Sequence, residues 1–193
     1  MTAESPVVYD ANILFSFHVS HVLTFMAVRR LVNAKWTEKI QREWLENFTK
    51  KYPDDVEGCR RRCDAMNRAL PSAMVTGYEH LIDKIAFKDP DDRHVIAAAL
   101  HSNAIGIVTL DGHFTSDSLK PFGLRVIDPD DLLVECADQF PGDCVKVLEQ
   151  SRLALTISNP THGQYLDILE SRGLTKFADR IRALNPALAP NLP

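Results

Sequence analysis

The sequence predicts an α/β protein built on a parallel sheet with helices on both faces, followed by an all-helical extension. Up to about residue 131, short apolar runs alternate with segments of helical periodicity, a pattern typical of parallel α/β folds. After that point apolar residues recur only at helical spacing, so no further strand is expected. We therefore predict one domain over residues 1–131 and a helical extension over residues 132–193, with a frayed tail from residue 185.

The chain is expected to begin with a buried strand and a helix. Residues 6–9 form an apolar run that ends on Asp10, and a helical pattern follows over residues 12–26. A second strand is expected near residues 31–36.

Two helices are predicted next. Thr37 is expected to cap a helix that carries Glu43, and Pro53 is expected to open another. The second helix carries the basic residues 60–62. Such a charged face is more often solvated than functional, with contact to nucleic-acid phosphates as the alternative.

The block Asp-Pro-Asp-Asp at residues 89–92 predicts another helix start. Asp89 suits the N-cap and Pro90 the first helical position, and the helix would run to Leu100. This explanation does not cover Asp92, because helical spacing places it on the apolar face with Val95. A carboxylate that points inward needs a compensating partner.

The clearest strand covers residues 105–110 and ends on Asp111, and another is expected at residues 124–127. Asp128, followed by a proline, then suits a helix start.

Composition excludes several classes of protein. Apolar residues make up 45% of the 193 residues and charged residues 25%, which is ordinary for a globular chain. Neither a membrane span nor a secretory signal is evident, so a cytoplasmic protein without a membrane partner is expected. The net charge of −4 provides no global attraction for nucleic acid.

The cysteines lack a C-x-x-C pair and are interpreted as reduced: Cys59, Cys63, Cys136 and Cys144.

Four acids are candidates for one site. Asp10 and Asp111 each follow a strand, where open parallel sheets bind their ligands, and Asp92 and Glu43 lie on helices whose apolar faces pack on the sheet. Gathered together, carboxylates repel one another unless a cation is present. Mg²⁺ or Mn²⁺ prefers oxygen ligands and joins them to a substrate phosphate. The implied reaction is metal-assisted phosphodiester hydrolysis.

Neighbouring polar residues are candidates for support. Asn12 and Thr109 could hold the acids by hydrogen bonds. Arg93, His94 and His113 could orient carboxylates or contact substrate, although a structural role is the alternative for each histidine. Weaker candidates for RNA contacts are Arg29, Arg30, Lys35 and residues 60–62.

Four blocks in this order resemble the PIN-domain nuclease family, and within it bacterial VapC-type toxins of type II toxin–antitoxin systems. The blocks are residues 7–12, 36–43, 89–99 and 107–111. The resemblance covers roughly residues 6–131, and the helical tail is similar to that of a longer VapC subgroup. It implies a three-layer α/β/α sandwich and a Mg²⁺- or Mn²⁺-dependent endoribonuclease that cleaves single-stranded or looped RNA.

The resemblance also assigns roles. Asp10, Glu43, Asp92 and Asp111 match the family's four acids, of which the three aspartates are expected to bind metal, and Asp89 matches a supporting acid. A cognate antitoxin and a homodimer are implied as well. The chain departs from the family at Gly112-His113, where many members carry another acid, which leaves one metal or two open.

Other interpretations remain. The chain could be a PIN nuclease that matures housekeeping RNA or cuts DNA, or a catalytically silent PIN scaffold that binds proteins. A haloacid-dehalogenase-like phosphatase normally uses D-x-D, but the second position here is Asn12. A receiver domain has no place for Glu43 or for the block at residues 89–92.

Overall fold

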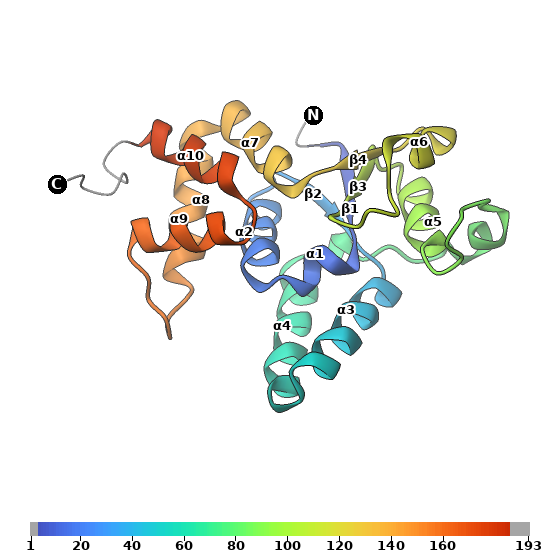
Figure 1. Ribbon diagram of the computed structural model, residues 1–193, viewed down its shortest axis with the longest axis horizontal. Helices are drawn as coiled ribbons and strands as arrows, with labels where there is room; N and C mark the ends of the chain where they lie inside the picture. The colour runs from blue at the N-terminus through green and yellow to red at the C-terminus, as the bar shows by residue number, and fades with distance from the viewer. Residues whose placement is uncertain (1–3, 186–193) are drawn as a thin grey trace.

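The computed structural model describes residues 4–185 and contains a parallel sheet with helices on both sides (Figure 1). The predicted fraying of the tail concerns residues that lie almost wholly outside this range. The strands are β1 (Pro6–Tyr9), β2 (Asn33–Lys35), β3 (Gly106–Val108) and β4 (Arg125–Ile127). Their order in the sheet is β2-β1-β3-β4, and every neighbouring pair is parallel.

The strands lie where the sequence predicts them, but β2, β3 and, by one residue, β4 are shorter than expected. β3 ends at Val108 rather than at residue 110, although the Thr109 amide still donates to the Ile127 carbonyl (3.1 Å). Beyond β2, Trp36 forms an isolated parallel bridge with Met74. Gly106 allows β3 to approach β4, because a Cβ there would lie 2.4 Å from the Arg125 carbonyl oxygen.

The helices are α1 (Ala11–Phe15), α2 (Phe17–Val28), α3 (Glu38–Lys51), α4 (Val56–Ala69), α5 (Arg93–His101), α6 (Ser116–Leu119), α7 (Pro129–Gln139), α8 (Pro141–Leu153), α9 (His162–Ser171) and α10 (Thr175–Leu184). Short 3₁₀ helices are η1 (Pro53–Asp55), η2 (Pro71–Ala73), η3 (Glu79–Lys84) and η4 (Lys120–Phe122). No helix within residues 4–185 is both long and apolar enough to span a membrane.

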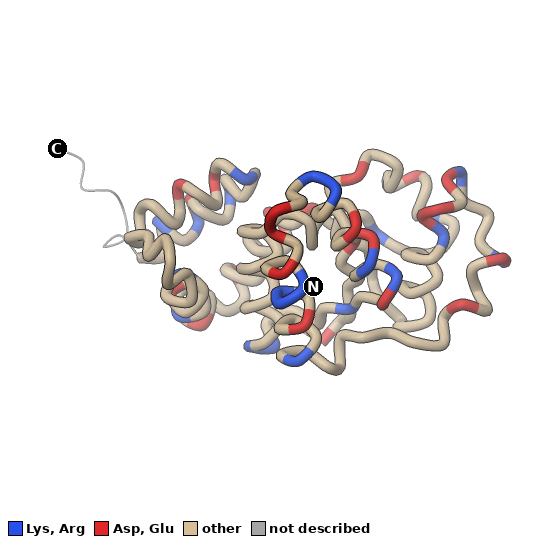
Figure 2. The backbone as a smooth tube through the Cα atoms, turned by 90° about the horizontal axis from the view of Figure 1, so that it is seen from below, with Lys and Arg blue, Asp and Glu red and all other residues tan. Residues whose placement is uncertain are grey.

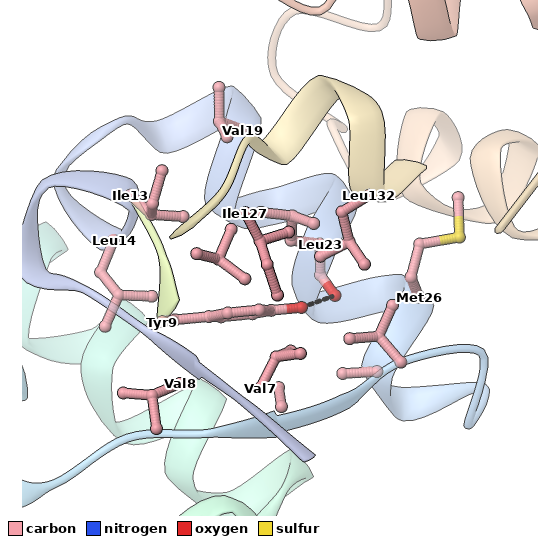
Figure 3. Close-up of a cluster of buried hydrophobic side chains, with 14 of the residues drawn as sticks. Val7, Val8, Tyr9, Ile13, Leu14, Val19, Leu23, Met26, Ile127 and Leu132 are labelled. Carbon is pink, nitrogen blue, oxygen red and sulfur yellow. Dashed lines mark hydrogen bonds between the residues drawn. The ribbon is translucent and has the colours of Figure 1, made fainter. Parts of the chain in front are cut away.

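Helices α2 and α5 cover opposite faces of the sheet, which gives the predicted α/β/α layers (Figure 1). Side chains alternate along a strand, so Tyr9 and its neighbour Val8 face different layers. The buried Tyr9 hydroxyl donates to the Leu23 carbonyl of α2 (3.4 Å), and the surrounding core includes Leu132 of α7 (Figure 3).

The single helix predicted over residues 12–26 is wrong, because Ser16 interrupts it with an extended conformation (φ −73°, ψ 108°). Arg62 of α4 fills the break: its guanidinium donates to the Leu14 carbonyl and, at 2.6 Å, to Ser20 Oγ. The same guanidinium lies 4.5 Å from the Trp44 ring centroid. Arg62 is therefore a structural residue rather than part of a solvated basic patch or an RNA contact, whereas Arg60 and Arg61 are exposed.

The predicted start of α5 is also wrong. The Asp89 carboxylate accepts the Asp91 amide (2.9 Å) and caps a turn, and the helix begins only at Arg93. Residues 89–92 thus form turns in which Asp92 is the N-cap residue, without a capping bond from its side chain. The turns place Asp89 Oδ2 and Asp92 Oδ2 near His113, in the loop after β3.

The C-terminal helices are tied to the rest of the molecule. Helix α7 begins as predicted, with Asp128 accepting the amides of Asp130 and Asp131. The buried Asp130 carboxylate in turn accepts the backbone amides of Lys176 (2.9 Å) and Phe177 (2.8 Å) and thereby caps α10. Helix α8 packs on α2.

Candidate functional site

The predicted acids gather at the carboxyl ends of β1 and β3. The chain leaves β1 toward β2 on one side and returns to β3 on the other, so these two strands form the topological switch point where open α/β sheets bind ligands. Asp10 follows β1 directly, while Thr109 and Asp111 follow β3. The sequence prediction of a site at these strand ends therefore agrees with the sheet order.

Asp10 is held by hydrogen bonds from three groups. Its Oδ1 accepts the Ala11 amide (2.7 Å), and its Oδ2 accepts Asn12 Nδ2 (2.7 Å) and Thr109 Oγ1 (2.9 Å). Because Oδ2 already accepts two bonds, Oδ1 is the oxygen that keeps a lone pair for a further ligand.

Asn12 and Thr109 also fix the loop after β3. Asn12 Nδ2 donates to Thr109 Oγ1 (2.9 Å), and its Oδ1 accepts the Leu110 amide (3.2 Å). Thr109 Oγ1 accepts the Asp111 amide (2.9 Å). These bonds join the ends of β1 and β3, as expected of residues that support a metal site.

Burial is the main electrostatic influence on Asp10. The residue is 7% exposed, and desolvation raises its pKa to about 6, with smaller contributions from the charges of Asp92 and Asp111. The hydrogen bonds from Thr109 and Ala11 lower the pKa but do not offset the burial.

Glu43 reaches the site from α3. Thr37 caps this helix as predicted, with its hydroxyl accepting the Ile40 amide (3.1 Å). His94 Nε2 lies 3.0 Å from Glu43 Oε1 and Lys39 Nζ 3.7 Å from it. His94 is 2% exposed, so it can position the Glu43 carboxylate but is not placed to contact substrate.

A second group of ligand atoms surrounds His113. Its Nδ1 lies 3.3 Å from Asp92 Oδ2, 3.5 Å from Asp89 Oδ2 and 3.7 Å from Asp111 Oδ1. Burial and the nearby charge of Asp89 raise the pKa of Asp92, and the hydrogen bond from His113 lowers it. Arg93, in contrast, donates to the Phe87 carbonyl (3.3 Å) and does not line the site.

One pocket of about 430 Å³ brings the four predicted acids together. We call it the acidic pocket; its lining residues are Asp10, Ala11, Asn12, Phe15, Glu43, Asn47, Asp91, Asp92 and Asp111. Sequence reasoning missed Phe15, Asn47 and Asp91. Asn47 could have been found, because it lies one helical turn after Glu43 on the same face of α3.

The donor set fits a hard divalent cation. Carboxylates from four segments face one pocket without a lysine or arginine among its lining residues, and oxygen is the ligand that Mg²⁺ and Mn²⁺ prefer. Within residues 4–185, the group whose ligand atoms already lie within 4.8 Å of one another is Asp89, Asp92 and His113. A cation shared with Asp10 would therefore require movement of the Asp92 or Asp111 side chain; these are 20% and 37% exposed.

Comparisons with known proteins identify the family. Residues 129–183 match the family model described as the VapC50 C-terminal domain. A Mycobacterium tuberculosis protein named "Putative ribonuclease VapC50" is 33% identical over 123 residues, which cover 63% of this chain and 71% of that protein. No solved structure matches the chain. The chain thus belongs to the VapC-type PIN-domain family, among members that carry a C-terminal extension.

Proposed function

We propose that this protein is a metal-dependent endoribonuclease that cleaves single-stranded or looped RNA. The observation that carries the proposal is the convergence of Asp10, Glu43, Asp92 and Asp111 on one pocket at the switch point of the sheet. The similarity to a protein named as a ribonuclease supports RNA as the substrate.

The aspartates would hold the cation, and Glu43 would act beside it. Asp10 offers Oδ1, while Asp92 and Asp111 offer further carboxylates in the same pocket. When bound, Mg²⁺ or Mn²⁺ activates water and neutralises charge on the scissile phosphate. Glu43 is 31% exposed and is oriented by His94, which suits it to accept a proton from the attacking water.

We assign the activity to the toxin of a toxin–antitoxin pair, with an antitoxin protein as partner, a homodimer as the assembly and the cytoplasm as its location. The VapC relationship supports the toxin and antitoxin assignments. Housekeeping RNA maturation, DNA cleavage and a silent scaffold are the alternatives. The complete set of acids in one pocket favours a catalyst over a scaffold.

The test is cleavage of a small-RNA pool by purified protein freed of any partner. With Mn²⁺ or Mg²⁺ we expect cuts at a few mapped positions, and with EDTA none. Asp10→Asn should abolish the cuts, whereas Asp54→Asn, which alters an exposed acid in η1, should not. Equal cleavage by wild type and Asp10→Asn would contradict the proposal.

A further inference from the structure

A second pocket adjoins the acidic pocket and has different chemistry. It measures about 580 Å³ and lies between residues 86–90 and residues 112–118. The His113 side chain lines this second pocket, while its Nδ1 lies close to Asp92 and Asp111 of the acidic pocket. The two pockets therefore meet at His113.

The walls of the second pocket combine apolar and polar groups. Ala86, Phe87 and Pro90 supply apolar surface, and the Phe87 ring is fixed by stacking on Phe114 (centroids 5.5 Å apart, 23° between planes). Thr115 and Ser118 add hydroxyls, and Asp89 adds a carboxylate at the side shared with His113. A volume in the range of about 300–1,000 Å³ is typical of small-ligand sites. A nucleoside, with apolar base faces and polar edges, suits such walls.

Lys88 supplies the cation that the acidic pocket lacks. It lines the second pocket and forms no ion pair with any residue in the described part of the chain. Elsewhere in the described part of the chain, basic residues are scattered among acidic ones (Figure 2), and the net charge of −4 provides no global attraction for RNA. An ammonium in the wall of the second pocket suits a phosphate next to the one being cut.

Gly112 lines the second pocket and has open space beside it. A Cβ at this position would meet no atom within 4 Å, and its φ lies outside the left-handed region. A larger side chain can be accommodated by the backbone and would extend into free space at the rim.

We propose that the second pocket is a substrate subsite that receives the nucleoside next to the scissile phosphate, with Lys88 contacting an adjoining phosphate. The inference rests on the proposed ribonuclease activity, which supplies the scissile phosphate in the acidic pocket. The subsite would determine which nucleotides are accepted beside the cut.

The experiment compares two substrates in Mn²⁺. One is a labelled single-stranded RNA of random sequence, and the other is bis(p-nitrophenyl) phosphate, a diester without a nucleoside. We expect Gly112→Leu to lower kcat/KM for RNA about ten-fold more than kcat/KM for the small diester, the scale of one lost base contact. It should also change the nucleotide preference next to the cut.

Lys88→Gln tests the subsite without altering the loop after Asp111. Losing one phosphate contact should reduce the slope of log KM for RNA against log salt by about 0.7. Lys84→Gln, which removes an exposed charge from nearby η3, is the matched control and should leave the slope unchanged.

The outcomes separate the two proposals. Suppose that wild type cleaves RNA, and that Gly112→Leu and Lys88→Gln both cleave it with wild-type kinetics and nucleotide preference. The subsite proposal is then contradicted, while the ribonuclease proposal is supported. If wild type hydrolyses neither substrate, the ribonuclease proposal fails and the subsite fails with it.

Discussion

Asp10 shows how one residue combines structural and chemical demands. The carboxylate caps α1 and joins the ends of β1 and β3 through Asn12 and Thr109. The same position buries it beside other acids, so its pKa rises to about 6. The metal-free carboxyl therefore takes up a proton at a higher pH than an ordinary aspartate does, and a divalent cation would compete with that proton.

The raised pKa of Asp10 predicts a pH dependence of stability in EDTA. Between its ordinary pKa of 3.8 and about 6, the folded state binds more protons than the unfolded state, so the free energy of unfolding decreases as pH rises. The contribution is roughly 2–3 kcal/mol across this window. Urea denaturation of wild type and Asp10→Asn from pH 4 to 7 measures it. A constant difference between the two proteins across the window would contradict the prediction.

Glu43 allows catalysis to be separated from stability. Glu43→Gln keeps an oxygen at the position that lies 3.0 Å from His94 Nε2, so the free energy of unfolding should change by less than about 0.5 kcal/mol. The variant loses the proton acceptor, and RNA cleavage should decrease about 10²-fold or more. Single-turnover cleavage and urea denaturation measure the two effects. Wild-type cleavage by a stable Glu43→Gln would exclude Glu43 from the reaction.

At the scale of elements, local signals predicted structure well where the determining contacts are local. Thr37 and Asp128 cap the helices that follow them, and β1 is an uninterrupted apolar run. The break at Ser16 was missed because Arg62, 48 residues from Leu14, stabilises it. A contact between residues so far apart does not change the hydrophobic periodicity of either helical segment, so the sequence pattern cannot predict it.

Arg62 should therefore stabilise the hairpin of α3 and α4 against α1 and α2. Burial lowers its pKa to about 10, but the group stays charged at neutral pH. Arg62→Ala removes hydrogen bonds and the stacking on Trp44, and should cost about 2–4 kcal/mol of unfolding free energy. Thermal or urea denaturation checks this value. Arg61→Ala, on the exposed face, is the control and should cost less than about 0.5 kcal/mol; equal losses would contradict the structural role.

At the scale of the whole molecule, the sequence predicted the acids but not the shape of the site. Strand ends and block order indicated Asp10 and Asp111, because the carboxyl ends of parallel strands meet at one edge. The remaining walls, such as Phe15 and Asn47, depend on how α1 and α3 pack. The sequence analysis included His94 among the candidates to contact substrate, whereas the structure buries it. Its burial results from packing and cannot be predicted from the local sequence.

The helical extension is expected to unfold together with the rest of the chain. Helix α8 packs on α2, where His21 Nε2 lies 2.9 Å from the Ser151 carbonyl oxygen and Cys144 contacts Met26. The shared core predicts one cooperative transition in calorimetry, with equal calorimetric and van't Hoff enthalpies. Two separate transitions would mean that the predicted division near residue 131 is a division into independent folding units.

The most direct test of the metal site is titration of the purified, EDTA-treated protein with Mn²⁺ by calorimetry. Wild type and Asp54→Asn should bind Mn²⁺ with equal affinity at neutral pH. Asp10→Asn should bind it at least about 10-fold more weakly, because a charged oxygen ligand is lost from the acidic pocket. Unchanged Mn²⁺ affinity in a folded Asp10→Asn protein would show that the carboxylates at the switch point of the sheet do not hold the cation.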